Sequence, residues 1–214
     1  MQIVLARHGE TSWNVEGRYQ GQGFDIPLSE AGLGQAGALR ERLKDMTFRR
    51  AVSSPLLRAR QTAELVLADA SRILRFDPAL MEMAHGEWEG RLDSEIRKGD
   101  EALRQAWRET PHLVTLPGGE SFQRVLARAW PAFCEACQGL SAEDTLLVVS
   151  HDAVNRALLC QILGLPMAQV WRFRQAPACL NLLEGPDAEH LAVVRLNDAV
   201  HLAPLFGEVV HRRV

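Results

Sequence analysis

The sequence lacks several features that would each point to a particular class of protein. It has no surplus of positive charge, because 24 Lys and Arg stand against 27 Asp and Glu and give a formal net charge of −3. Nucleic acid is therefore not an expected partner. No apolar run is long enough to cross a membrane, and the first run, from Ile3 to Arg7, is too short for a secretory signal. We expect a cytoplasmic protein without a membrane partner.

Cysteine is also scarce, with four residues in 214. In the cytoplasm these thiols are expected to stay reduced. Cys134 and Cys137 form a C-x-x-C motif, but their sequence neighbourhood contains no second ligand pair for a structural zinc. We interpret the two cysteines as small apolar residues on one face of a helix.

The apolar residues that are present fall into short, nearly continuous runs. Such runs are typical of strands that are covered on both faces, as in a mostly parallel sheet. The predicted strands are Gln2–Ala6, Arg50–Ser53, Ile73–Phe76, Thr145–Ser150, Leu180–Glu184 and Leu191–Leu196.

Segments with helical spacing lie between these strands. Ser29 is the expected N-cap of a helix that runs to about Leu43. Apolar residues also repeat at helical spacing in 55–70, 121–137 and 152–163. Strands that alternate with helices predict an α/β fold, a three-layer α/β/α sandwich with a mostly parallel central sheet.

We expect one domain over residues 1–214, with an excursion from its core at 85–120. This segment is highly charged and has only a thin apolar stripe. It therefore predicts one or two exposed helices. They are either simply solvated or form a small helical lid over a site.

Polar side chains follow three of the predicted strands, at the point where each strand ends. Arg7 and His8 follow the first strand, His151 follows the strand at 145–150, and Arg58 lies in the first turn of the helix after the second strand. Because ligands of open α/β sheets bind beyond the carboxyl ends of the strands, we expect these side chains to share one crevice. Two arginines and two imidazoles make it electropositive, and guanidinium groups match phosphate oxygens in pairs. The expected ligand is a phosphomonoester.

These residue types are suited to phosphoryl transfer. One histidine can attack phosphorus as a nucleophile. A carboxyl group with a raised pKa can then protonate the leaving oxygen and later activate water. Spacing alone leaves that group open among Glu10, Glu82, Glu87 and Asp152. We expect no metal ion and no cofactor, because the arginines already offset the phosphate charge and no acidic cluster of the magnesium-binding kind is evident.

Five segments of the chain resemble the histidine phosphatase superfamily, also called the phosphoglycerate mutase-like family. In chain order they are LARHGETSWN, SSPLLRARQTAE, LMEMAHGEWEG, PGGESFQRVLARA and LLVVSHDAVNRALL. The resemblance covers nearly the whole chain, and the R-H-G-E-T opening is its most specific motif. It implies a phosphoglycerate mutase-like fold and, from further short segments, the phosphatase branch of the family.

The resemblance also implies catalytic roles. His8 would be the nucleophile that forms a phosphohistidine, and Glu82 would be the acid and then the base. Arg7, Arg58 and His151 would hold the phosphoryl group and stabilise it during transfer.

Four further residues are implied as a substrate-binding set. Asn14 matches a family position that contacts phosphate, and Gln20 matches another in some phosphatases. Thr11 and Gly21 are weaker matches. No metal ligand is implied.

Some residues depart from the pattern of the glycolytic mutases that use 2,3-bisphosphoglycerate. Those enzymes carry an arginine directly after the acid and a pair of arginines in the middle insertion. Here Met83 follows Glu82, and no Arg-Arg pair lies within 85–120. The groups that hold a phosphoglycerate carboxylate are therefore missing, which favours hydrolysis. Asp152 stands where glycine or alanine is more common, and the sequence gives it no role.

We predict a phosphomonoesterase that hydrolyses small phosphorylated metabolites, either with broad specificity or like α-ribazole phosphatase. One alternative is a cofactor-dependent phosphoglycerate mutase. Another is a protein that binds a phosphorylated ligand without catalysis. The sequence does not identify the substrate, and it is compatible with a homodimer without fixing the oligomeric state.

Overall fold

A computed structural model describes residues 1–202 and has one six-stranded sheet at its centre. The strands are β1 (Gln2–Arg7), β2 (Arg50–Ser53), β3 (Leu74–Phe76), β4 (Thr145–Ser150), β5 (Leu180–Glu184) and β6 (Ala192–Asp198). Their order is β3-β2-β4-β1-β5-β6. The first four strands in this order are parallel, whereas β5 runs antiparallel to β1 and β6 antiparallel to β5. The predicted mostly parallel sheet is confirmed.

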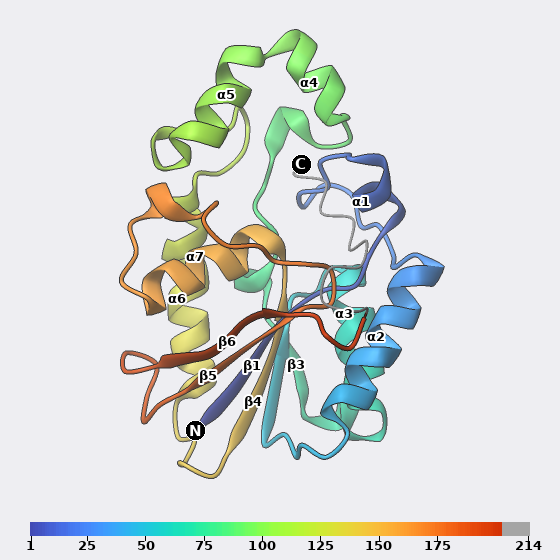
Figure 1. Cartoon of the computed structure of the whole chain (residues 1–214), viewed down its shortest axis with the longest axis vertical. Helices are drawn as coiled ribbons and strands as arrows, with labels where there is room; N and C mark the ends of the chain where they lie inside the picture. Colours follow the sequence, from blue (N-terminus) through green and yellow to red (C-terminus); the bar gives the residue numbers. More distant parts are fainter. Residues whose placement is uncertain (203–214) are drawn as a thin grey trace.

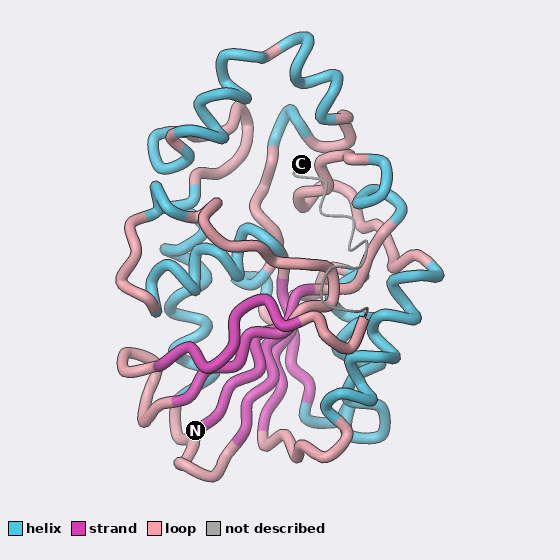
Figure 2. Tube along the Cα trace, viewed as in Figure 1, coloured by secondary structure: helices cyan, strands magenta, loops and turns pink. Residues whose placement is uncertain are grey.

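Helices cover both faces of this sheet (Figure 1). The long helices are α2 (Glu30–Leu43), α3 (Leu57–Leu67), α6 (Phe122–Cys137) and α7 (Asp152–Ile162). Two of them, α2 and α3, pack on one face, and α6 and α7 pack on the other, so that the strands form the middle layer (Figure 2). Among the helices of residues 1–202, none combines the length and the apolar character needed to span a membrane.

The side chains of β1 point alternately to the two layers of helices. Ile3 and Leu5 are buried in a core with residues of α6 and α7, whereas Val4 and Ala6 are buried in a second core with residues of α2 and α3. Because both faces of the strand are covered, both sets of side chains are apolar. This explains the continuous apolar run that ends at Arg7.

Polar caps define where two helices begin. Ser29 Oγ accepts a hydrogen bond from Gly32 N at 3.0 Å and caps α2, as predicted. Thr11 and Asn14 form a capping box at the start of a short helix, α1 (Ser12–Glu16). This helix is too short for a periodic pattern, and the sequence did not predict it. The 3₁₀ helices are η1 (Ala68–Ile73), η2 (Pro78–Leu80), η3 (Gly86–Trp88), η4 (Pro111–Leu113) and η5 (Met167–Gln169).

The charged segment 85–120 contains the helices α4 (Asp93–Gly99) and α5 (Glu101–Glu109), which lie beyond the carboxyl edge of the sheet (Figure 1). The apolar stripe anchors it: Ile96 and Trp107 are buried, and the Trp107 ring stacks on Phe122 of α6 with centroids 5.0 Å apart. The segment is therefore packed on the core and not simply solvated. Its action as a lid stays a prediction. So does the single domain over 1–214, since residues 203–214 lie outside the described part.

Candidate active site

The carboxyl ends of β1, β2 and β4 lie side by side, because β4 pairs with both of the other strands. A pocket of about 200 Å³ lies at this edge of the sheet. The predicted site residues that line it are Arg7, His8, Asn14, Gln20, Arg58 and Glu82. His151 lies behind this wall and is fully buried, with its ring centroid 5.1 Å from that of His8. Thr11 and Gly21 do not line the pocket.

His8 is held rigidly and presents one ring nitrogen to the pocket. Its backbone N–H donates to Ser150 O, and its carbonyl accepts from Ala178 N. The ring Nδ1 lies 2.6 Å from Gly9 O, an oxygen that can only accept, so Nδ1 carries the proton and Nε2 keeps its lone pair. Burial, and then the positive charges of Arg7 and Arg58, hold the pKa of His8 well below its usual value. The imidazole is therefore neutral at neutral pH, as a nucleophile has to be.

Arg58 brings an incompletely paired positive charge into the pocket. It is fully buried on α3, and its NH2 donates to Gly21 O at 2.8 Å. Its Nε and NH1, like Nε of Arg7, are buried without a hydrogen-bond acceptor among residues 1–202. Burial lowers the pKa of Arg58 to about 10, so the guanidinium stays charged at neutral pH. Unpaired buried donors of this kind are costly, and a phosphate group would supply their acceptors.

His151 occupies the N-cap position of α7 and adds a buried imidazole behind His8. Its Nε2 lies 2.7 Å from Ser54 Oγ, and its buried Nδ1 has no partner within residues 1–202. Burial, followed by the charge of Arg58 and the His8 ring, lowers the pKa of His151 well below its usual value. In the described part of the chain, no group of three or more His, Cys, Asp or Glu could hold a metal ion.

Glu82 lies in the loop after η2 and is 6% exposed. Its Oε1 accepts hydrogen bonds from Met83 N at 2.8 Å and from Ala153 N, in the first turn of α7, at 3.3 Å. Burial, and then the negative charge of Asp152, raises the pKa of Glu82. A carboxyl group in this position favours its protonated form more than an exposed one does, which suits a general acid.

The other three carboxyl candidates are placed differently. Glu10 accepts a hydrogen bond from Ser29 Oγ at 3.0 Å and does not line the pocket. Glu87 is exposed and does not line it either. Asp152 does line it but is engaged by arginines. Among the four candidates, the geometry favours Glu82.

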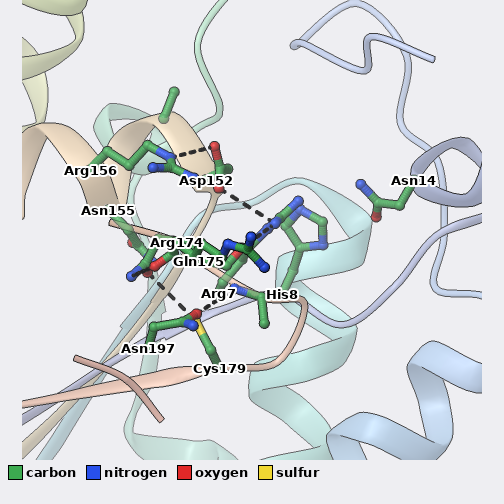
Figure 3. Close-up of polar contacts among 12 residues, drawn as sticks. Arg7, His8, Asn14, Asp152, Asn155, Arg156, Arg174, Gln175, Cys179 and Asn197 are labelled. Atoms are coloured by element: carbon green, nitrogen blue, oxygen red, sulfur yellow. Dashed lines mark hydrogen bonds and ion pairs between the residues drawn. The ribbon is translucent and has the colours of Figure 1, made fainter. Parts of the chain in front are cut away.

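Asp152, which had no role in the sequence interpretation, bridges two arginines (Figure 3). Its Oδ2 lies 2.8 Å from Arg156 Nε, and its Oδ1 lies 3.5 Å from Arg7 NH1. Arg156 is fixed in turn by hydrogen bonds to the carbonyls of Val170 and Phe173. The NH1 of Arg7 also donates to Gln175 O at 2.5 Å. Asp152 therefore helps to orient Arg7 and adds negative charge beside Glu82.

The substitution Asp152→Asn is expected to shift the alkaline limb of the pH–rate profile to lower pH. The charged groups that act on Glu82 are Asp152, which raises its pKa, and Arg58 and Arg7, which lower it. Removing the Asp152 charge leaves the two arginines unopposed, so Glu82 loses its proton at lower pH. The measurement is kcat/KM against pH for an alkyl phosphate, with the exposed Asp187→Asn as the control variant. An alkaline limb that stays in place would contradict this coupling.

The predicted binding residues divide into two groups. Asn14 faces the His8 ring (Figure 3), and its Oδ1 accepts from Thr11 N at 3.0 Å, which leaves the amide N–H groups available to a ligand. Gln20 lines the pocket, and its buried Oε1 has no donor among residues 1–202. Thr11 and Gly21 lie outside the pocket and position residues that line it. Thr11 N donates to Asn14 Oδ1, and Gly21 O accepts from Arg58 NH2.

Much of the outer pocket was missed by the sequence interpretation. Its wall is aromatic on one side and carries several further arginines. These residues are Arg18, Tyr19, Arg108, Arg156, Trp171, Phe173 and Arg174. They lie on α5, on α7 and in loops. The rule that ligands bind at the ends of strands therefore does not predict them.

Several proteins that are similar to this chain carry the name of a phosphatase. The sequence profile of the histidine phosphatase superfamily (branch 1) matches residues 3–199. Phosphoserine phosphatase 1 of Hydrogenobacter thermophilus is 34% identical over 210 residues, 97% of each chain. The adenosylcobalamin/alpha-ribazole phosphatase of Salmonella typhimurium is 35% identical over 184 residues, 86% of this chain and 90% of that protein.

Other similar proteins include a mutase by name and a solved phosphatase. A Salmonella choleraesuis protein named "Probable phosphoglycerate mutase GpmB" is 32% identical over 98% of this chain and 99% of its own. The structure of a mycobacterial glucosyl-3-phosphoglycerate phosphatase with VO3 superposes with a TM-score of 0.83 at 32% identity, over 92% of this chain and 98% of that chain. The chain therefore belongs to the histidine phosphatase superfamily, branch 1, which confirms the prediction of a phosphoric monoester hydrolase.

Proposed function

We propose that the protein hydrolyses phosphomonoesters of small metabolites through a phosphohistidine on His8. The observation that carries this proposal is the state of the His8 ring, which lines the pocket beside Arg7 and Arg58 and whose Nδ1 is held by Gly9 O, so that Nε2 keeps its lone pair. Buried N–H groups of Arg7 and Arg58 have no acceptors within residues 1–202, and a phosphate group in the pocket would supply them.

In the first step Nε2 of His8 attacks phosphorus, and a new N–P bond replaces the ester P–O bond. Glu82 donates its proton to the leaving oxygen, and the alcohol departs. Arg7, Arg58 and His151 stabilise the charge on the phosphoryl oxygens during the transfer. Asn14 and Gln20 add polar contacts to the same group.

In the second step water replaces the alcohol. The carboxylate of Glu82 accepts a proton from the water as its oxygen attacks phosphorus. The N–P bond breaks, inorganic phosphate leaves, and both His8 and Glu82 return to their starting protonation states.

The direct test is to trap the intermediate during turnover of p-nitrophenyl phosphate. Acid lability and base stability identify a phosphohistidine, and peptide mapping after a rapid quench should locate the phosphoryl group on His8. Failure to release phosphate between mildly acidic and neutral pH would favour a binding protein without catalytic activity.

A phosphoglycerate mutase is the second candidate, because similar proteins carry that name. The absence of an arginine after Glu82 and of an Arg-Arg pair in 85–120 argues against it. We expect water to be the acceptor. Interconversion of 2-phosphoglycerate and 3-phosphoglycerate, stimulated by 2,3-bisphosphoglycerate and faster than phosphate release, would reverse this choice.

Activity is expected to survive complete chelation. Two guanidinium groups already offset the charge of the phosphate, so the proposed steps need no metal ion. The measurement is the rate of phosphate release after prolonged dialysis against EDTA, compared with an undialysed sample. Loss of activity that zinc restores would contradict the proposed mechanism.

For the substrate we propose only a chemical class, the phosphomonoesters of small metabolites. A panel of phosphorylated metabolites, including phosphoserine, α-ribazole phosphate and glucosyl-3-phosphoglycerate, would separate a broad-specificity enzyme from a dedicated one. We propose a cytoplasmic enzyme, which the four free cysteines support. A homodimer stays a prediction.

A further inference from the structure

The motif PGGESFQRVLARA contains an ion pair that the proposed chemistry does not use. Glu120 precedes the N-cap of α6, and Arg128 lies two turns into this helix. Arg128 Nε lies 2.8 Å from Glu120 Oε1, and Arg128 NH2 lies 2.9 Å from Oε2, which makes the pair bidentate. Both side chains are mostly buried. Burial alone would raise the pKa of Glu120, but hydrogen bonds from Arg128 and Ala84 N hold it below its usual value.

The guanidinium of Arg128 also holds the backbone of the loop that carries Glu82. Its NH1 donates to Ala79 O at 2.6 Å and to Met81 O at 2.8 Å. Its NH2 donates to Glu82 O at 3.0 Å. One side chain therefore fixes three carbonyls up to and including that of Glu82.

Glu120 fixes the same loop on the other side of Glu82. Its Oε2 accepts from Ala84 N at 2.8 Å, and its own backbone N–H donates to Ala84 O at 2.8 Å. Gly119 makes this approach possible, because a Cβ at that position would lie 2.4 Å from Ala84 O. Gln22 Nε2 adds a contact to Glu82 O at 2.6 Å.

The segment between η2 and η3 has no helix or strand of its own to fix Glu82. The position of its carboxyl group therefore depends on these contacts. This position matters for catalysis, because a displacement of about 1 Å can lower the reaction rate about 100-fold. We propose that Glu120 and Arg128 are positioning residues that hold the loop 79–84 so that the Glu82 carboxyl stays at the N-terminus of α7. This inference rests on the proposed role of Glu82 as acid and base.

The experiment compares kcat/KM for an alkyl phosphate and for p-nitrophenyl phosphate, whose leaving group needs little protonation. Glu120→Gln is expected to lose about 10- to 100-fold on the alkyl phosphate and only a few-fold on the nitrophenyl ester. Arg128→Lys keeps the charge but loses the planar fork, and it should show the same selective loss. Should Glu120→Gln fail to fold, Arg128→Lys provides the same comparison.

The decisive variant combines the Glu120→Gln substitution with Glu82→Gln. Residues that act through Glu82 lose their effect when its acid function is gone, so Glu82→Gln/Glu120→Gln should be no slower on the alkyl phosphate than Glu82→Gln alone. Arg50→Met is the control, because Arg50 also donates to carbonyls, those of Ala136 and Gln138, at the far end of α6. It should leave both rates unchanged.

The possible failures can be told apart. Equal losses on both substrates, or a further loss in the Glu82→Gln background, would show a merely structural pair and overturn the proposal. If Glu82→Gln is selective and Glu120→Gln is not, the positioning role is wrong while the function stands. If Glu82→Gln is itself not selective, the acid role and the positioning role fall together.

Discussion

Replacement of His8 by alanine is expected to reduce turnover by at least about 10⁴-fold while inorganic phosphate still binds. The variant removes the nitrogen that attacks phosphorus, and no other ring nitrogen takes its place. His151 is fully buried behind His8, and its Nε2 is already engaged with Ser54 Oγ. Arg7 and Arg58 remain, so the phosphate-binding groups are intact.

Two measurements check this result. Phosphate release from p-nitrophenyl phosphate gives the loss of turnover, and isothermal titration with inorganic phosphate gives the binding constant. His190→Ala is the matched control, since His190 is exposed and its ring contacts Asp187, outside the pocket. A variant without His8 that still forms an acid-labile phosphoenzyme would place the nucleophile elsewhere.

The half of the pocket that carries His8 was predictable from the sequence because its residues lie where strands end. A strand buried on both faces has a continuous apolar pattern, and parallel neighbours end at one edge of the sheet. The positions of Arg7, His8 and His151 therefore follow from the ends of β1 and β4. The choice of Glu82 was harder, since four carboxyl groups fitted the spacing and only the resemblance to a family selected one.

The groups that orient this chemistry were not predictable, because they depend on contacts between distant segments. Asp152 reaches Arg7 only because β1 and β4 are neighbours, although the two residues are far apart in the chain. Arg128 contacts the carbonyls of the loop 79–84 from α6, a helix whose existence was predicted but whose place beside that loop was not. Trp171 and Phe173 line the pocket from a loop whose position follows from packing.

Glu82→Gln is expected to lower kcat/KM for alkyl phosphates by about 10²- to 10⁴-fold and for p-nitrophenyl phosphate by less than about 10-fold. An alkoxide leaves poorly without a proton, whereas nitrophenolate leaves readily. Glutamine has nearly the same shape and still accepts from Met83 N and Ala153 N, so the loop should keep its position. The constant kcat/KM reports the first step alone, because it covers events up to the release of the alcohol.

The second step gives an independent signature of the same residue. Without a carboxylate to accept the proton of water, hydrolysis of the phosphohistidine should become rate-limiting, and kcat should fall for both substrates. A burst of nitrophenolate equal to the enzyme concentration should then appear, followed by slow turnover. Glu87→Gln is the matched control, since Glu87 lies nearby in the chain but is exposed and outside the pocket. Equal losses of kcat/KM on both ester types, with no burst, would remove Glu82 from the acid–base role and leave the phosphate-binding half of the site unaffected.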